Sequence, residues 1–217
     1  MTIVKEKKVK KEIDMINGPL MGKIIIFCIP LILSSVLQLL FNAADVVVVG
    51  QFAGKQSLAA VGSTGSLINL ITNLFIGFSI GTNVVMARAI GANNPEKASR
   101  TTHTSMLLAV VSGLIVGVIG FFASKGMLEL MDSPENVIDK AALYLKIYFL
   151  GSPASLVYNF GASVLRAKGD TRRPLYFLVI AGVLNALLNL FFVIVCKMDV
   201  AGVALATIIS QIVSALL

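Results

Sequence analysis

An acidic side chain stands alone in the first long apolar run of this sequence. Asp45 is the only acid between Ile24 and Gly50. A carboxylate in a membrane helix costs about 2.5–3.5 kcal/mol at mid-helix on insertion scales, so such a residue usually marks a functional site. Asp45 therefore either binds an ion or has only a structural role in holding helices together. The rest of the chain has to distinguish these two roles.

Further polar side chains recur with helical spacing around it. Gln38 and Asn42 share one helix face with Asp45, and Asn69 and Asn73 share a face in the next apolar run. Lipid cannot satisfy these groups, so both faces should point to a bundle interior or a wet cavity. Interhelical hydrogen bonding is the alternative role for such side chains, and for Asn69 and Asn73 both roles stay open.

The composition is that of a membrane protein. The chain has 217 residues, of which 57% are hydrophobic and 13% charged, whereas a soluble domain carries about 25% charged residues. The net charge of +7 does not indicate nucleic-acid binding, because the basic residues cluster at the ends of apolar runs without interleaved aromatics. There is no Ser/His/Asp set, phosphate loop or carboxylate pair, so we expect neither an enzyme nor a cofactor or resident metal.

Six apolar segments are long enough to span a bilayer, which takes about 20 residues each. They cover residues 23–50, 57–88, 100–122, 137–165, 174–196 and 200–217. The sequence therefore predicts an all-α integral membrane protein with a six-transmembrane-helix bundle over 23–217, preceded by a basic tail over 1–22. The last segment stops at Leu217 without a polar flank, which predicts that the chain is a fragment cut in or just after the sixth helix.

Lysine and arginine are unevenly distributed over the two sides. Most of them lie in the tail and in the connections around residues 88–100 and 166–173, and fewer lie in the other connections. The positive-inside rule puts the richer side in the cytoplasm. We expect a multi-pass protein of the plasma membrane with a cytoplasmic N-terminus.

Local signals mark the ends and bends of these helices. Asn94-Pro95-Glu96 and Ser133-Pro134-Glu135 each place a capping side chain before a proline in a first helical turn. Pro30 and Pro153 fall within predicted spans, where each removes a backbone hydrogen bond and favours a kink.

Two pairs of small residues have the GxxxG spacing. Gly77 and Gly81 form one pair, and Gly113 and Gly117 form the other. This spacing lets two helices approach closely in a membrane. We expect both pairs to serve close helix packing.

Several polar groups lie at similar depth on different spans. Counted at about 1.5 Å per residue, Asp45, Tyr144, Asn189 and Thr207 lie about 8–10 Å from the expected outer ends, with Asn185 about one turn deeper. Together they could form one site, unless helical rotation scatters them. A carboxylate with hydroxyl and amide oxygens suits a hard monovalent cation such as Na⁺, or a proton.

Three stretches resemble the multidrug and toxic compound extrusion (MATE) family of transporters. They are IPLILSSVLQLLFNAADVVVVGQFAGKQSLAAVG, RAKGDTRRP, and LNALLNLFFV followed by VAGVALATIISQ. The stretches lie between Pro19 and Gln211 and so cover most of the chain.

The resemblance implies twelve helices in two six-helix lobes, of which this chain is the N-terminal one, dependent on a C-terminal lobe. It implies a secondary antiporter that exports cationic or amphipathic compounds in exchange for Na⁺ or H⁺. The family's cation site carries over onto Asp45, Tyr144, Asn185, Asn189 and Thr207. Many members have Asp where this sequence has Asn189, so one carboxylate is lost, and this weakens the carry-over of Na⁺ coupling in particular to this chain.

Two other functions remain as alternatives. A lipid-linked precursor flippase of the same wider superfamily would need basic residues within the cavity, and the predicted spans contain no deeply placed Lys or Arg. A non-transporting membrane scaffold or channel subunit would need no buried ionisable group, and Asp45 argues against it.

Overall fold

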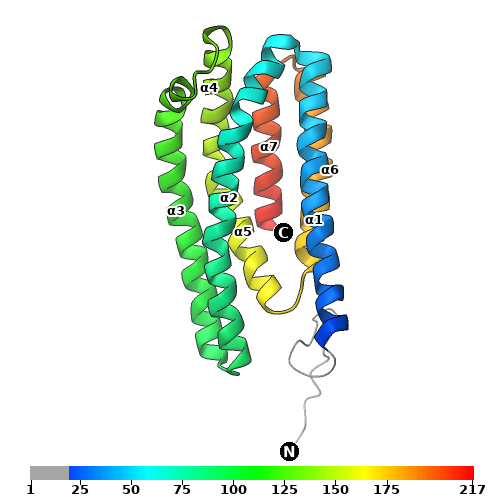
Figure 1. The fold of residues 1–217 in the computed structure, drawn as a ribbon, viewed down its shortest axis with the longest axis vertical. Helices are drawn as coiled ribbons and strands as arrows, with labels where there is room; N and C mark the ends of the chain where they lie inside the picture. The colour runs from blue at the N-terminus through cyan, green and yellow to red at the C-terminus, as the bar shows by residue number, and fades with distance from the viewer. Residues whose placement is uncertain (1–19) are drawn as a thin grey trace, which may run out of the picture.

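The computed structural model describes residues 20–217, which form a bundle of long helices (Figure 1). In chain order the elements are α1 (Leu20–Val48), η1 (Val49–Ala53), α2 (Lys55–Gly91), α3 (Pro95–Leu130), α4 (Glu135–Leu150), α5 (Ser152–Ala167), α6 (Arg172–Leu190), η2 (Phe191–Val195) and α7 (Asp199–Leu216), where η marks a π-helical segment. Most of the predicted tail of residues 1–22, with its lysines, falls outside the described residues.

The predicted six-helix membrane bundle is confirmed, with one span built differently from our expectation. Within residues 20–217, five helices are long and apolar enough to cross a membrane. The segment 137–165 is not one helix, because it is divided at Gly151 into α4 and α5 of 16 residues each. Pro153 lies in the first turn of α5, where its missing N–H is tolerated. In place of the kink predicted at Pro153, the helix is broken at Gly151, two residues earlier. Pro30, in contrast, lies inside an unbroken α1.

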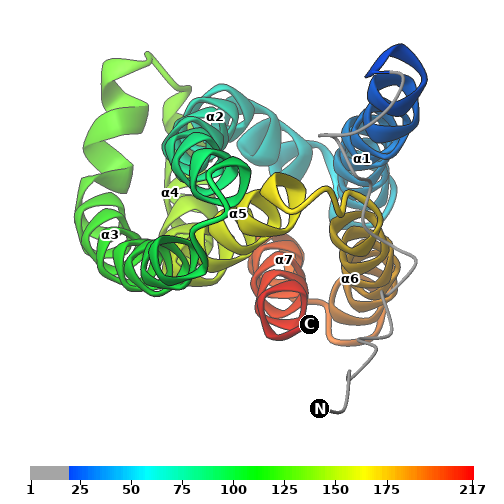
Figure 2. The ribbon, with the colours of Figure 1, turned by 90° about the horizontal axis from the view of Figure 1, so that it is seen from below.

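The helices form two groups joined by α7. Helix α3 packs on both α4 and α5, which follow one another along the chain, and α2 packs on α5 and α4. Helix α1 packs mainly on α6, and the pair stands to one side of the other group in the end view (Figure 2). Helix α7 contacts α6 as well as α4 and α5, so it closes the bundle between the two groups.

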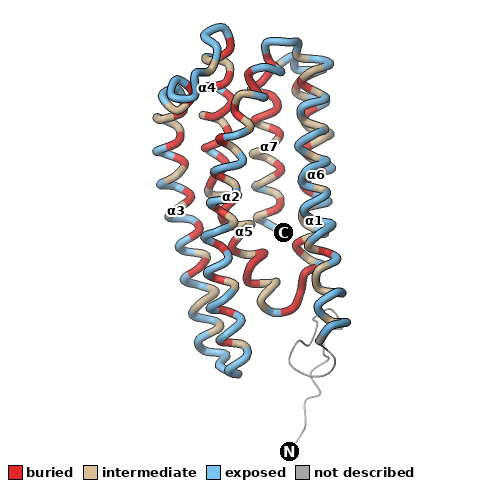
Figure 3. The backbone as a smooth tube through the Cα atoms, in the orientation of Figure 1, coloured by how far each residue is buried: buried red, intermediate tan, exposed pale blue. Residues whose placement is uncertain are grey.

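Burial follows this arrangement. The side chains of Leu145, Phe149 and Leu156 are fully buried in the α4–α5 region, whereas the outer faces of α1 and α3 are exposed along their length (Figure 3). Those outer faces are apolar, as Leu39 (70% exposed) and Phe122 (79% exposed) show. An exposed apolar surface of this extent requires a lipid solvent. The chain is therefore a multi-pass membrane protein.

The two predicted caps have different outcomes. The Asn94 side chain accepts a hydrogen bond from the Lys97 backbone N–H at 2.9 Å, as expected for an N-cap. The Ser133 prediction is wrong, because Pro134 takes the N-cap position of α4 and no side chain caps this helix. The Ser133 N–H instead bonds back to the Leu128 carbonyl at 3.1 Å, which makes Ser133 part of the end of α3.

The two glycine pairs also differ. Close packing is confirmed for Gly113 and Gly117, since a Cβ at Gly113 would meet the Cα of Pro153 at 2.5 Å. The Ser152 hydroxyl donates to the Gly113 carbonyl at 2.8 Å across the same contact. The prediction is wrong for Gly77 and Gly81, where nothing lies within 4 Å of an added Cβ. Those two glycines face outward on α2.

The contact at Gly113 predicts a large effect of one methyl group. Gly113→Ala forces α3 and α5 apart, and overpacking of this kind costs about 1–3 kcal/mol. Gly126→Ala is the matched control on the same helix, because open space surrounds Gly126. Thermal unfolding of the purified protein in detergent measures both. Equal melting temperatures for the two variants would contradict the packing described here.

Candidate functional site

A polar cavity of about 510 Å³ lies between the two helix groups. Helices α1, α2, α4, α5, α6 and α7 all contribute to its wall. Of the residues that the sequence singled out, the wall contains Gln38, Asn42, Asp45, Asn69, Asn73, Tyr144, Asn185 and Thr207. Side chains from five spans therefore meet around one space, and helical rotation does not scatter them.

A chain of hydrogen bonds runs across the cavity wall from α1 to α7. The Asn189 Nδ2 donates to Oδ1 of Asp45 and also to Oδ1 of Asn185, the latter at 3.2 Å. The Asn185 Nδ2 donates to the Thr207 hydroxyl at 3.4 Å. Four of the five residues in the predicted cation site thus form one connected network.

Asn189 is the centre of this network. Its side chain is fully buried, whereas Asp45 and Thr207 are partly exposed to the cavity. Both of these hydrogen bonds use the amide nitrogen of Asn189, and its Oδ1 atom is buried without a hydrogen-bond partner in the described chain. A buried acceptor of this kind is uncommon and is available to a proton donor or a cation.

Tyr144, the fifth residue of the predicted site, takes a separate position. It is buried on α4, lines the same cavity and lies within electrostatic range of Asp45. Among the described residues it has no hydrogen bond to the other four. The neighbouring Tyr148 hydroxyl bonds the Thr72 hydroxyl at 3.2 Å and so joins α4 to α2 across the wall.

The amides of α1 and α2 line the wall rather than join helices. Gln38, Asn42, Asn69 and Asn73 all contribute to the cavity surface. None of the four makes a side-chain hydrogen bond to another helix within residues 20–217. Of the two roles left open for Asn69 and Asn73, the placement favours cavity lining, and their part in transport stays a prediction.

The helices that carry Asp45 and Asn189 both end in a π-helical segment. Helix α1 passes into the π-helical segment η1 at Val49, and α6 passes into η2 at Phe191. The two segments contact each other. A π-helical turn adds a residue to the helical repeat, rotates the side chains that follow, and is frequent at functional sites. The hydrogen-bonded pair of Asp45 and Asn189 therefore lies next to a second contact, between η1 and η2, that joins the same two helices.

Sequence reasoning missed part of the wall. Tyr158 on α5 and Thr72 on α2 line the cavity, as do Ser210, Gln211 and Ser214 on α7. The signal for the α7 residues was present, because they continue from Thr207 at helical spacing. Nothing in the local pattern distinguishes Tyr158 from a tyrosine at the lipid interface.

Comparison with known protein families identifies the family of this chain. The family model described as MatE matches residues 30–191. The chain belongs to the MatE family. The matched range contains Asp45, Tyr144, Asn185 and Asn189, and Thr207 lies beyond it. The resemblance seen in the sequence is confirmed.

Relatives of MatE type in Bacillus subtilis (strain 168) include two named as probable multidrug resistance proteins. YpnP is 30% identical over 203 residues, covering 93% of this chain and 45% of YpnP. YoeA is 34% identical over 191 residues, covering 86% of this chain and 41% of YoeA. The chain thus spans less than half the length of either relative.

A solved structure shares the arrangement of the helices. It is described as the outward-facing conformation of a multidrug resistance MATE family transporter of the MOP superfamily. It superposes with a TM-score of 0.87 at 28% identity and covers 97% of this chain and 46% of that chain.

The network predicts the effect of a second carboxylate. In Asn189→Asp two acceptors face each other, so they must share a proton or a cation. We expect this variant to be less stable than the parent at high pH without Na⁺, and to gain melting temperature on acidification or on Na⁺ addition, because a ligand of the folded state stabilises it. Thermal unfolding over a pH and Na⁺ series measures this gain.

The control is Asn73→Asp, which adds a carboxylate to the same wall without a hydrogen bond to Asp45. Equal gains for the two variants would show that position 189 has no special relation to Asp45.

Proposed function

We propose that this chain is the ion-coupling half of a secondary antiporter that exports cationic or amphipathic compounds in exchange for Na⁺ or H⁺. The observation that carries the proposal is a single carboxylate, Asp45, at the wall of a polar cavity in a MatE-family chain. The names of the relatives YpnP and YoeA, which refer to multidrug resistance, support an exported compound as the cargo.

One carboxylate is sufficient for the exchange of a cationic compound against an ion. Asp45 is the only ionisable acid of the cavity wall within residues 20–217, and the other wall residues are neutral. Two unit charges about 4 Å apart interact by about 4 kcal/mol at an effective dielectric constant of 20, which corresponds to roughly a thousandfold in affinity. A proton or Na⁺ at Asp45 therefore competes strongly with a cationic compound in the same cavity.

Loading of Asp45 also acts on the packing of α1. Ionised Asp45 accepts a hydrogen bond from Asn189 and so holds α1 against α6, its main packing partner. A proton on the carboxylate or Na⁺ beside it competes with that bond. Loading would then bias the position of α1, and an ion shifts such an equilibrium only through its different affinities for the two states. Tyr144 and Thr207 supply further oxygens for a bound cation.

The proposed transporter includes a second half. The relatives are about twice as long as this chain, so we propose that a C-terminal six-helix lobe completes the substrate path. We further propose that the protein resides in the plasma membrane with its basic connections in the cytoplasm.

The composition of the wall separates this proposal from the flippase alternative. A diphosphate-linked lipid requires cationic side chains, and the described cavity wall contains neither Lys nor Arg. A scaffold or channel subunit would not require a hydrogen-bonded carboxylate at this cavity wall, where such a group is costly.

Asp45→Asn tests the proposal. The amide keeps the shape of the side chain and removes its charge, so ion-driven export should fall to background while expression stays normal. Efflux of a cationic dye from cells or vesicles with an imposed Na⁺ or proton gradient is the measurement.

Asp139→Asn is the matched control, because Asp139 is an exposed acid paired with Lys125 outside the cavity. Undiminished gradient-driven efflux by the Asp45→Asn variant would contradict the proposal that Asp45 couples export to the ion.

A further inference from the structure

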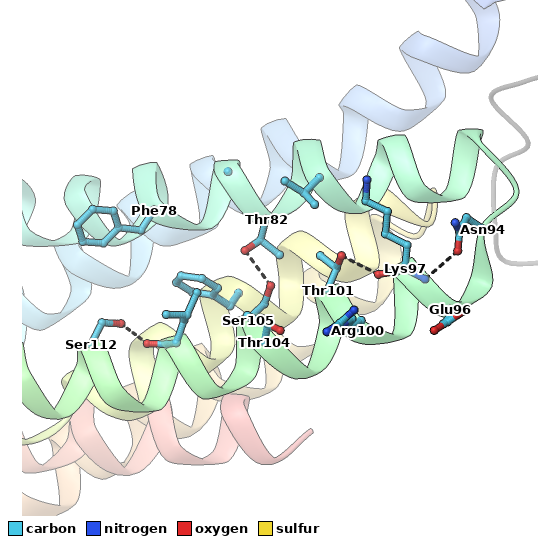
Figure 4. Close-up of a pocket in the computed structure, with 14 residues that line it drawn as sticks. Phe78, Thr82, Asn94, Glu96, Lys97, Arg100, Thr101, Thr104, Ser105 and Ser112 are labelled. Atoms are coloured by element: carbon cyan, nitrogen blue, oxygen red, sulfur yellow. Dashed lines mark hydrogen bonds between the residues drawn. The ribbon is translucent and has the colours of Figure 1, made fainter.

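A second hollow lies on the other side of α2, away from the polar cavity. It is a groove of about 910 Å³ between α2 and α3 (Figure 4). The buried Phe160 of α5 also lines it. The groove shares no lining residue with the polar cavity. Gly81 leaves room on the α2 side, since nothing lies within 4 Å of a Cβ there.

The groove has an apolar body. Its walls include Phe78 and Val85 from α2 and Leu108 from α3, all of which are substantially exposed. The hydroxyls of Thr82 and Ser105 are buried and bond each other at 3.1 Å, so the polar atoms at its floor are satisfied (Figure 4). An occupant of this part gains from burial of hydrocarbon and needs no polar group.

The mouth of the groove is basic. Lys97 and Arg100 lie at the end where Asn94 caps α3, and Thr101 and Thr104 add hydroxyls nearby. Glu96 is the one acid in the lining, and Figure 4 shows it directed away from Lys97. Both Lys97 and Arg100 are exposed and make no ion pair within the described chain. The mouth therefore offers a net positive charge to an anion.

The groove is long enough to hold a lipid that spans one leaflet of a bilayer. The helix from Asn94 to Ser112 extends about 27 Å, and half of a bilayer with its headgroups measures about 20–22 Å. Helices α2 and α3 have 37 and 36 residues, about 55 Å each, so their joined ends reach beyond the hydrocarbon. The charged mouth thus falls at headgroup depth and the apolar body at acyl-chain depth.

We infer that this groove binds one anionic phospholipid, with its phosphate at Lys97 and Arg100 and an acyl chain along Phe78, Val85 and Leu108. A cationic compound is repelled by the mouth, and a small soluble anion leaves the apolar body empty. The inference does not depend on the proposed antiport, because it rests on a different surface of the chain.

Lipid retention by the full-length protein tests the inference. Native mass spectrometry compares dioleoyl-phosphatidylglycerol with dioleoyl-phosphatidylcholine, which has the same chains and no net charge. We expect the parent protein to retain the anionic lipid preferentially. At about fivefold per basic residue near a membrane surface, Lys97→Gln with Arg100→Gln should weaken this retention about 30-fold. Lys168→Gln with Arg172→Gln, two exposed basic residues at the other predicted cytoplasmic connection, should leave it unchanged.

A second pair of variants tests the apolar body. Gly81→Leu fills the groove without a backbone clash and should reduce retention of both lipids, whereas Gly62→Leu, at an open position elsewhere on α2, should not. Equal retention of the two lipids by the parent would overturn the inference. So would equal retention of the anionic lipid by the two double variants, which is also the result expected if the other half of the transporter covers the groove.

Discussion

The rest of this structure depends on the hydrogen bond between Asp45 and Asn189. A carboxylate within a membrane span has no water of its own, so it must find a donor in the protein or a cavity that admits water. Asp45 has both, because Asn189 donates to it and the polar cavity reaches it. Helix α1 packs mainly on α6 and exposes an apolar face elsewhere, and this bond joins the polar faces of the two helices.

Charge of opposite sign is kept apart on the two sides of α2. The polar cavity has one acid and no base in its described wall, and the groove between α2 and α3 has a basic mouth. If both proposals hold, cations bind between the helix groups while anionic lipid binds outside them. The same helix then separates the path of a cationic cargo from an anionic lipid, whose phosphate would otherwise bind that cargo.

Much of this could be predicted from the sequence, and the exceptions have physical reasons. Asp45 stands out because a lone carboxylate is costly in lipid, and Asn185 and Asn189 share a face because they lie one helical turn apart. The division at Gly151 and the π-helical segments η1 and η2 leave no comparable pattern, since each depends on packing against other helices. The prediction of helix packing at Gly77 and Gly81 is wrong, because GxxxG spacing does not say which face of a helix another helix covers.

The most direct test of the central claim is the distance between α1 and α6 with and without the coupling ion. Spin labels at Leu39 and Leu187, both exposed on their helices, report it by double electron–electron resonance once Cys28 and Cys196 are replaced. We expect high Na⁺ or low pH to shift the distance distribution in the parent protein and not in Asp45→Asn. An ion-dependent shift of the same size in both proteins, or in neither, would contradict this claim.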